Sequence, residues 1–391
     1  MKILMVLPGD FPPDIRVENE ALSLQKAGHS ITIACQTRNS RPPHDTFNDK
    51  IKIVRNELNL LDYKLSAAAL SLPFYFKKWD SFLSGVLKTE RFDAIHIHDL
   101  PLAKIGYKLA EEYRIPMVLD LHENWPALLA ISQHSKSLWG KILINIAQWK
   151  AYELEMCRLT DKIIVVVDEA KSRLLKHSIP ESKISIVSNT LNASSLQILS
   201  FHKKKAHGLR LFYGGGINKH RGLQVVLNAM ALVRNDLPEI QLDIVGDGSY
   251  VDSLKKLCED LRISDIIKFY GHLPFHKMGE VMANADIALI PHLKSEHTDA
   301  TIPHKIFQYM YMGIPILSSD CDPLVRIINE CKAGLIYKND SAQSFAEKLF
   351  ELNNLLINNE FHHEIPRENV LNKYVWEIDS KILISTYNDI S

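Results

Sequence analysis

A glycine-rich segment with a basic residue connects a predicted strand to a predicted helix in the second half of the chain. Residues 214–222 read Gly-Gly-Gly-Ile-Asn-Lys-His-Arg-Gly, and a helix-like apolar stretch follows at 223–234. Glycines such as Gly215 and Gly216 let backbone amides approach an anion, the helix start adds its positive dipole end, and Arg221 adds a full charge. The segment is typical of a diphosphate site, although a tight glycine turn without a ligand explains the same residues.

A second glycine pair follows another predicted strand, at Gly246 and Gly248. Neither glycine segment fits the dinucleotide fingerprint G-x-G-x-x-G, because Lys219 and Val251 stand where the third glycine belongs. The pattern therefore favours a phosphate-binding turn over a nicotinamide or flavin site.

A predicted helix near residue 303 places a cation at its start. Pro303 favours a helix start, and Lys305 and Gln308 fall three residues apart on one face. A cation at the positive end of a helix dipole is unfavourable unless an anion lies between them, so Lys305 favours a phosphate site. The alternative is a solvated lysine at a helix end.

Histidines gather at two other predicted strand ends. His96 and His98 point to the same face of a strand, and Asp99 and His122 follow this strand and the next one. Such a group predicts either a hydrolase metal centre or, with better support, histidines whose hydrogen bonds are satisfied inside the fold.

The segment 65–79 combines apolar residues, aromatics and lysines, including Phe74, Lys77, Lys78 and Trp79. This composition is found in segments that bind a membrane surface. Packing between helices explains it at least as well, so both interpretations stay open here.

Short apolar runs alternate with helical patterns along nearly the whole chain, which predicts βαβ units and two doubly wound α/β domains with parallel sheets. The rhythm breaks at residues 192–207, which we interpret as a linker. Ligands of such sheets bind beyond the carboxyl ends of the strands, where the residues above are found. The predicted strands are residues 2–7, 31–35, 51–54, 94–98, 117–121, 162–167, 184–187, 209–213, 241–245, 267–270, 287–290, 316–318 and 334–337.

The overall composition excludes several classes of protein. The chain has 391 residues, 46% hydrophobic and 24% charged, and a formal net charge of zero, so no global basic surface for nucleic acid is expected. Five scattered cysteines without a C-x-x-C pair suit a reducing compartment and no cysteine zinc site. The short apolar start before Pro8 predicts a strand and no signal peptide, and no long apolar run predicts a membrane span. We expect a cytoplasmic protein.

Six motifs in order resemble glycosyltransferase family 4, in a bacterial branch with the pattern Pro-x-Lys-x-Phe-x-Tyr-Met. Together they extend over most of the chain: Phe11-Pro12-Pro13-Asp14-Ile15-Arg16, His98-Asp99-Leu100-Pro101, Asp120-Leu121-His122-Glu123, Val245-Gly246-Asp247-Gly248, Pro303-x-Lys305-x-Phe307-x-Tyr309-Met310 and Tyr374-x-Trp376-Glu377.

The resemblance implies the GT-B fold, two Rossmann-like domains facing across a cleft. An acceptor domain would span residues 1–192, a linker 193–207 and a nucleotide-sugar donor domain 208–371. The last helix, about 372–391, would pack back on the first domain.

The resemblance also implies the roles of individual residues. The catalytic residues would be His122, Arg221 and Lys305, with the two cations on the diphosphate of a UDP- or GDP-linked sugar and His122 making a neutral hydrogen bond beside the transferred sugar. The donor site would be completed by Asp14 and Arg16 on a loop facing the donor, the glycines Gly215, Gly216 and Gly246, the turn Gly271, His272 and Leu273 near the base, and Gln308 on the ribose. Neither a metal nor a cofactor is implied.

The chain departs from the family at three positions. Family members usually carry two glutamates eight positions apart, where this chain has Ala300 and Gln308, and many carry a phosphate-binding arginine in place of Gly216. An amide at Gln308 still hydrogen-bonds a ribose hydroxyl pair, but without charge assistance.

These observations predict a retaining, metal-independent hexosyltransferase that extends a glycan or a lipid-linked acceptor in surface polysaccharide synthesis, with peripheral contact to the anionic inner membrane. Two alternatives stay open. One is a GT-B sugar-nucleotide epimerase, and the other is a non-catalytic GT-B partner subunit, which the residues at 300 and 308 motivate.

Overall fold

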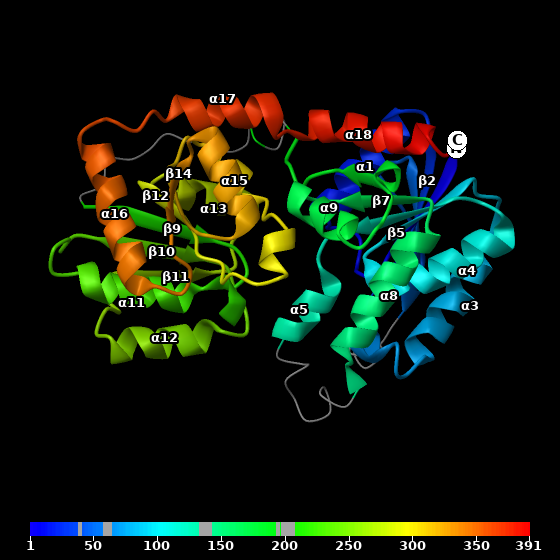
Figure 1. Ribbon diagram of the computed structural model, residues 1–391, viewed down its shortest axis with the longest axis horizontal. Helices are drawn as coiled ribbons and strands as arrows, with labels where there is room; N and C mark the ends of the chain where they lie inside the picture. The colour runs from blue at the N-terminus through cyan, green and yellow to red at the C-terminus, as the bar shows by residue number, and fades with distance from the viewer. Residues whose placement is uncertain (38–40, 58–64, 133–142, 193–195, 197–207) are drawn as a thin grey trace. The chain divides into compact units, whose positions relative to one another are not determined.

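The chain forms two compact units in a computed structural model that describes all residues except 38–40, 58–64, 133–142, 193–195 and 197–207 (Figure 1). Unit 1 comprises Met1–Ser188 and Ile378–Ser391, and unit 2 comprises Asn189–Glu377. The predicted linker 193–207 lies outside the described residues except for Leu196. The segment that returns to unit 1 starts at Ile378, because the residues before it still pack within unit 2.

Unit 1 is built on an eight-stranded sheet with the order β3-β4-β2-β1-β5-β6-β7-β8. Every described pairing is parallel except that of β3 with β4, which is antiparallel. The sequence did not predict β3, because three of its four residues are polar and Phe47 alone makes no apolar run. The strands are β1 (Lys2–Leu7), β2 (Ser30–Thr37), β3 (His44–Phe47), β4 (Ile51–Glu57), β5 (Ala94–His98), β6 (Met117–Leu121), β7 (Lys162–Val165) and β8 (Ile184–Ile186).

Most connections between the parallel strands of unit 1 contain helices, as in βαβ crossovers, whereas the chain between β2 and β4 contains β3. The α-helices are α1 (Ile15–Lys26), α3 (Phe74–Thr89), α4 (Ala103–Tyr113), α5 (Trp125–Ile131), α8 (Ile146–Leu159) and α9 (Asp168–Leu175). Short 3₁₀ turns are η1 (Leu65–Ala68), η2 (Leu100–Leu102) and η3 (Glu181–Lys183).

The helix α18 (Trp376–Asn388) follows unit 2 in the chain but, from Ile378 on, belongs to unit 1. Its buried residues within unit 1 are Asp379, Leu383, Thr386 and Tyr387. The spacing i, i+4, i+7, i+8 puts these side chains on one face. The helix is therefore held in unit 1 by a continuous buried stripe.

Unit 2 is built on a six-stranded, fully parallel sheet with the order β11-β10-β9-β12-β13-β14. The strands are β9 (Arg210–Gly214), β10 (Gln241–Val245), β11 (Ile267–Gly271), β12 (Ile287–Ile290), β13 (Ile316–Ser319) and β14 (Gly334–Tyr337). The helices are α11 (Leu223–Val233), α12 (Val251–Asp260), α13 (Phe275–Met282), α14 (Lys305–Tyr311), α15 (Asp322–Cys331), α16 (Ala342–Ile357) and α17 (Glu364–Lys373), with 3₁₀ turns η4 (Lys219–Arg221) and η5 (Thr298–Ala300).

Buried strands form the core of each unit. All residues of β5, β6, β12 and β13 are buried, which is the pattern of strands covered on both faces. The predicted α/β class with parallel sheets is confirmed for both units. Among the helices in the described ranges, none combines the length and the apolar character needed to cross a bilayer.

Candidate functional site

Three neighbouring strands of unit 2, β9, β10 and β11, end side by side, and backbone hydrogen bonds join the turns that follow them. The Gly215 N–H donates to the Val245 carbonyl at 2.9 Å, and the Gly246 N–H donates to the Gly271 carbonyl at 2.8 Å. The sheet thus brings three of the predicted glycines together at its carboxyl edge, where ligands of such sheets bind.

Two of these glycines cannot be replaced without strain. Gly215 has φ +137°, and a Cβ there would lie 2.8 Å from the Nζ atom of Lys305. Gly246 has φ +138°, and a Cβ would lie 1.9 Å from the Gly215 carbonyl oxygen. Gly216 differs, because the nearest atom to an added Cβ is a side-chain atom of Asn218 at 3.8 Å.

The two predicted cations, Lys305 and Arg221, lie at this edge without anionic partners. Lys305 begins α14, and its Nζ lies 3.9 Å from the centre of the Tyr213 ring. Arg221 ends η4; its Nη1 lies 3.1 Å from the Nε2 of His292, and its buried Nε makes no hydrogen bond. Within the described part of the chain, neither cation pairs with a carboxylate.

Burial and the charge of Arg221 hold the pKa of Lys305 well below its usual range. A partly buried charge without a carboxylate partner is costly, so the two neighbouring cations favour a bound anion. A diphosphate carries the charge and the acceptor oxygens that Lys305 and Arg221 lack. We call Gly215, Gly246, Arg221 and Lys305 the anion cradle.

Three histidines that the sequence analysis did not select surround Arg221. His292 and His297 are 2% exposed and follow β12, and the ring of His297 lies 6.2 Å from that of His220. Burial and the charge of Arg221 lower the pKa of His220 and of His297 to about 4, and that of His292 well below its usual value. They are neutral at pH 7. His292 and His297 follow a predicted strand end, and this position is the signal by which the sequence could have identified them.

The remaining residues predicted for unit 2 lie near the same edge. Gln308 is 7% exposed and lies one helical turn after Lys305 on α14. His272 is exposed and Leu273 partly buried, in the turn after β11. Their contacts with a nucleotide stay predictions.

In unit 1, His122 lies between two carboxylates. Its Nε2 is 2.8 Å from Asp120 Oδ2, and its Nδ1 is 3.7 Å from Asp99 Oδ2. Burial opposes protonation, but the two carboxylates outweigh burial and raise the pKa of His122 to about 10. This pKa favours a protonated His122 at neutral pH, in contrast to the neutral imidazole expected from the sequence, because the fold places Asp99 and Asp120 on either side of the ring.

The backbone of Asp99 adopts an unusual conformation, with φ 65° and ψ 153°. Its N–H donates to the Asp120 carbonyl at 2.8 Å, which holds the residue in place. Strained non-glycine residues cluster at functional sites, where the surrounding structure imposes them. The strain here aims the Asp99 carboxylate at the imidazole.

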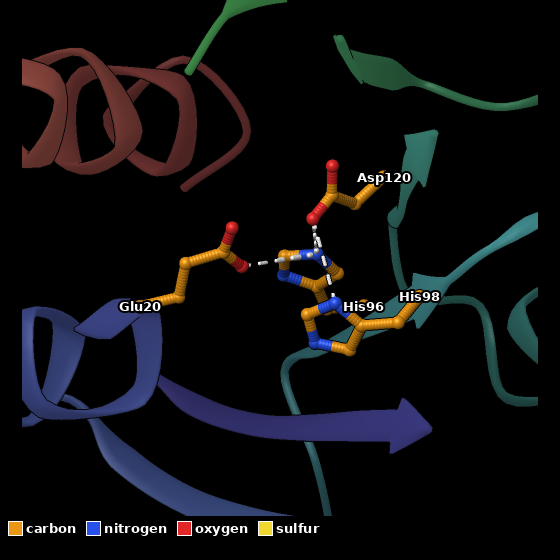
Figure 2. A group of neighbouring side chains, drawn as sticks. All are labelled: Glu20, His96, His98 and Asp120. Carbon is orange, nitrogen blue, oxygen red and sulfur yellow. Dashed lines mark ion pairs between the residues drawn. The ribbon is translucent and has the colours of Figure 1, made fainter. Parts of the chain in front are cut away.

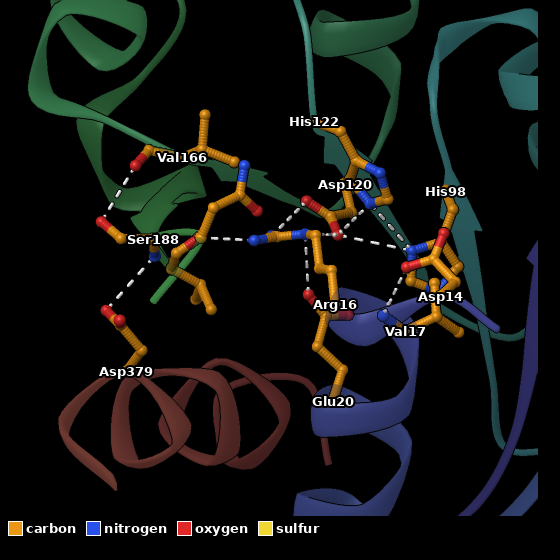
Figure 3. A network of polar contacts seen from close by, with 12 residues as sticks. Asp14, Arg16, Val17, Glu20, His98, Asp120, His122, Val166, Ser188 and Asp379 are labelled. Carbon is orange, nitrogen blue, oxygen red and sulfur yellow. Dashed lines mark hydrogen bonds and ion pairs between the residues drawn. The ribbon is translucent and has the colours of Figure 1, made fainter. Parts of the chain in front are cut away.

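Arg16 anchors this network from inside unit 1 (Figure 3). Its Nε and Nη2 donate to the two oxygens of Asp120 at 3.0 Å and 2.8 Å, and its Nη1 donates to the Val187 carbonyl at 2.9 Å. The guanidinium is 5% exposed and also lies 3.0 Å from Glu20. Predicted on a loop facing the donor, Arg16 instead lies in α1 and holds Asp120 in place for His122.

Asp14 has a defined structural role at the start of α1. Its side chain accepts a hydrogen bond from the Val17 N–H at 3.1 Å, and Glu18 accepts one from the Asp14 N–H at 3.1 Å. This reciprocal arrangement caps the helix that carries Arg16. A contact of Asp14 with a donor stays a prediction.

Four buried side chains place their polar atoms within 4.8 Å of one another: Glu20, His96, His98 and Asp120 (Figure 2). The rings of His96 and His98 stack with centres 4.3 Å apart, as their alternate positions on β5 predict.

This group differs from the metal set considered from the sequence, in which Asp99 and His122 stood with the two histidines. The Arg16 guanidinium lies against Glu20 and Asp120 and already supplies the positive charge that a metal would bring. Burial also raises the pKa of Glu20 well above its usual value, which disfavours the carboxylate form that a metal would bind. We therefore assign the group to the polar network of His122.

The segment 65–79 divides between core and surface. Trp79 is fully buried and Tyr75 is 1% exposed, whereas Phe74 is 59% exposed and lies in α3 with the exposed Lys77 and Lys78. The interpretation of the whole segment as a membrane-binding surface is wrong for Trp79, because it packs inside unit 1. The surface part shrinks to Phe74, Lys77 and Lys78.

Two families of known proteins match the two parts of the chain. The family "Glycosyltransferase Family 4" matches residues 15–195, and the family "Glycosyl transferases group 1" matches residues 198–369. The two matches follow one another without overlap and together cover most of the chain.

Individual relatives agree with these families. The chain is 21% identical to the phosphatidyl-myo-inositol mannosyltransferase of Mycolicibacterium smegmatis over 402 residues, covering 100% of this chain and 94% of the relative. It is 21% identical to the glycogen synthase of Mycobacterium tuberculosis over 74% of this chain and 72% of the relative. It is 22% identical to the putative colanic acid biosynthesis glycosyltransferase WcaL of Escherichia coli, over 50% of this chain and 48% of the relative.

Solved structures share the fold. The sucrose-phosphate synthase of Thermosynechococcus elongatus aligns with a TM-score of 0.79 at 14% identity, covering 99% of this chain and 98% of that chain. Anabaena HepE in complex with UDP-glucose aligns with a TM-score of 0.71 at 12% identity, covering 100% of both chains. Both are GT-B glycosyltransferases, so the predicted fold is confirmed.

Proposed function

We infer that this chain, whose residues 15–195 and 198–369 match those two glycosyltransferase families, transfers a sugar from a nucleotide-sugar donor to an acceptor. The observation that carries the proposal is the pair of cations, Arg221 and Lys305, which lie beside the glycine turns of unit 2 and pair with no carboxylate among the described residues. Their charge and geometry fit the diphosphate of a nucleotide-sugar.

The donor in this proposal is a UDP- or GDP-linked hexose. HepE, a structural neighbour, has been solved with UDP and with UDP-glucose, and a second neighbour has been solved with UDP-2-fluoro glucose. In our chain Gln308 would hydrogen-bond the ribose, and the turn Gly271, His272 and Leu273 would lie near the base.

The proposed chemistry relies on charge stabilisation, with neither a metal nor a cofactor. Arg221 and Lys305 would neutralise the negative charge that develops on the leaving diphosphate, which is the role of preorganised cations at such sites. The acceptor would attack from the face that the diphosphate leaves, so the anomeric configuration is retained, and a leaving oxygen would take the acceptor proton. His122, as a cation, would donate a hydrogen bond to a sugar hydroxyl and hold the sugar in position.

The acceptor in this proposal is a glycan or a lipid-linked sugar of a surface polysaccharide, at the cytoplasmic face of the inner membrane. WcaL is named for colanic acid biosynthesis, and another relative, AmsK of Erwinia amylovora, for amylovoran biosynthesis. The exposed side chains of Phe74, Lys77 and Lys78 are the proposed membrane contact.

Incubation of the purified protein with single nucleotide-sugars tests the proposal. We expect one of the donors to be hydrolysed slowly, with release of the nucleoside diphosphate. A chelator should not change this rate, and Lys305→Met should abolish the reaction. If the donor is α-linked, the NMR spectrum should show the α-sugar as the first product. Formation of a new nucleotide-sugar without release of diphosphate would indicate an epimerase. Binding of the donor without any turnover would favour a non-catalytic subunit, consistent with Ala300 and Gln308.

A further inference from the structure

The segment that carries Arg221 lies against the loop that leaves β12. On one side of Arg221, the Leu293 N–H donates to the His220 carbonyl at 2.9 Å. On the other side, a Cβ added at Gly222 would lie 1.7 Å from the Pro291 carbonyl oxygen, so only a glycine allows the two backbones to approach this closely. The backbone on both sides of Arg221 is therefore fixed to this loop.

The side chain of Arg221 contacts the same loop between these two points. Its Nη1 lies 3.1 Å from the Nε2 of His292, which is 2% exposed. Because an arginine can only donate hydrogen bonds, Nε2 is the acceptor, and the imidazole carries its proton on Nδ1. The Ser319 hydroxyl of β13 donates to the His292 carbonyl, which ties the backbone of His292 to the sheet. Arg221 is thus connected to the sheet through a buried side chain.

His292 holds the guanidinium without neutralising its charge. Burial and the charges of Arg221 and Lys305 keep the pKa of His292 well below its usual value, so the ring is neutral at pH 7. A carboxylate in this place would compensate the charge of Arg221 and compete with a bound anion. A neutral acceptor occupies a single N–H and leaves the other donors of the guanidinium to a phosphate.

Such a contact favours binding of an anion. A long side chain that rotates freely must be ordered when a ligand binds, and this loss of freedom weakens the binding. An arginine that is already held in place avoids this loss. The contact with His292 therefore prepares Arg221 for a ligand before the ligand arrives.

We infer that His292 is a positioning residue, which holds Arg221 in place for the diphosphate of the donor. The inference rests on the function proposed above, in which Arg221 binds this diphosphate. His292 itself touches no substrate in this scheme and acts through Arg221 alone.

The proton of His292 tests the contact in the free protein. In wild-type protein labelled with ¹⁵N-histidine, the NMR signals of His292 are assigned through their loss in His292→Gln. They should show a protonated Nδ1 and an unprotonated Nε2 at pH 7. A proton on Nε2 would overturn the inference, because two donors cannot form the hydrogen bond with Arg221.

A matched pair of substitutions tests the effect on binding. Gln and Met have unbranched side chains of similar length, but only the Gln amide offers Arg221 a strong acceptor. In calorimetric titrations with UDP and with GDP, His292→Met should lower the affinity for the nucleotide that the wild type binds by about three- to tenfold. His292→Gln should bind as the wild type does. Equal losses in the two variants would overturn the inference.

A second background separates positioning from general distortion of the site. In Arg221→Met, the additional substitution His292→Met should cause no further loss of affinity, because its effect runs through Arg221. Ligand-detected NMR measures the weak binding expected of the double variant. A loss as large as the one in the wild-type background would mean that His292 supports the loop and not Arg221, which overturns the inference.

The proposed function and the inference fail on different results. Wild-type protein that binds neither nucleotide would contradict the proposed function, whereas the tautomer of His292 needs no ligand and tests the contact with Arg221 by itself. Should His292→Met not fold, the tautomer and the affinity of His292→Gln still decide, because a loss of affinity in His292→Gln would also overturn the inference.

Discussion

His122 and Lys305 are both partly buried bases, yet the fold shifts their pKa values in opposite directions. Asp99 and Asp120 raise the pKa of His122 to about 10, whereas burial and Arg221 hold that of Lys305 well below its usual range. The difference lies in their partners, two carboxylates in one case and a second cation in the other. The charge of His122 is thus compensated by carboxylates of unit 1, whereas the charge of Lys305 favours binding of an external anion.

The raised pKa of His122 predicts a loss of stability at alkaline pH. Below about pH 6.5 the folded and unfolded chains both protonate His122, and above it only the folded chain does, up to about pH 10. The stabilisation from this group is therefore complete below pH 6.5 and is lost as the pH rises through 10. Between pH 7 and 9.5 the free energy of unfolding should fall more steeply in the wild type than in His122→Gln, by on the order of 1–3 kcal/mol.

Tryptophan fluorescence is a suitable probe for this comparison, because Trp79, Trp125 and Trp149 lie in unit 1. Replacement of the exposed His177 by Gln serves as the control and should follow the wild type. Parallel curves for wild type and His122→Gln would show that His122 is not charged in the fold.

Gln308 carries a second prediction at this scale. An amide on α14 can bond a ribose hydroxyl pair, and a carboxylate would strengthen those bonds. We expect Gln308→Glu to preserve or tighten binding of a nucleoside diphosphate and Gln308→Ala to weaken it by about 1–2 kcal/mol. Calorimetry decides without knowledge of the acceptor. If both variants bind like the parent, Gln308 lies outside the site, which favours the non-catalytic interpretation.

At the scale of elements, the turns after β9, β10 and β11 are joined by backbone hydrogen bonds. They bring the glycine backbone close to the cations Arg221 and Lys305. Gly215 is central to it, because its positive φ and its missing side chain allow the approach of Lys305. A side chain there would push the ammonium away from the turn, whereas a Cβ at Gly216 makes only an ordinary contact with the Asn218 side chain, at 3.8 Å.

Gly215→Ala and Gly216→Ala are therefore a matched pair. The first should cost about 1–2 kcal/mol in nucleotide binding through backbone strain and displacement of Lys305. Gly216→Ala should bind the nucleotide as the wild type does, because a methyl group at this position leaves the backbone amide of residue 216 free to contact the phosphate. Equal effects of the two substitutions in a calorimetric titration would contradict the role of Gly215.

The sequence predicted the elements better than the contacts between them. Every predicted strand is found within three residues of its predicted ends, because buried parallel strands appear as apolar runs, and only the mainly polar β3 was missed in the described structure. Lys305 and Arg221 were found through their positions at strand and helix ends. The charge of His122 could not be predicted, since it depends on Asp99 and on Arg16, which packs against Asp120 from α1.

At the scale of the whole molecule, the chain completes unit 1 only with its last helix. Tyr387, Thr386 and Asp379 of α18 all make polar contacts in unit 1, the last with the N–H of Ser188 at 3.2 Å. The fold around His122 thus depends on residues made after the whole of unit 2. Motifs that are local in sequence could not indicate this dependence.

The proposed membrane contact is also tested on the whole protein. Vesicles containing anionic phospholipid should bind the protein at low salt and release it at high salt, because screening weakens the attraction of Lys77 and Lys78. Phe74→Ser should reduce this binding. The control Ile357→Ser, at a residue of α16 that is 67% exposed, should bind vesicles as the wild type does. Equal binding of both variants would mean that Phe74 is merely an exposed side chain.

The central claim is that Arg221 and Lys305 hold the diphosphate of a nucleotide-sugar, and calorimetric titration with UDP and with GDP tests it most directly. The account predicts binding of one of them without added metal and a loss of about 2–4 kcal/mol in Lys305→Met and in Arg221→Met. Lys277→Met, at an exposed lysine paired with Glu280, should bind as the wild type does. Binding of neither nucleotide, or equal affinity in Lys305→Met and the wild type, would contradict the account.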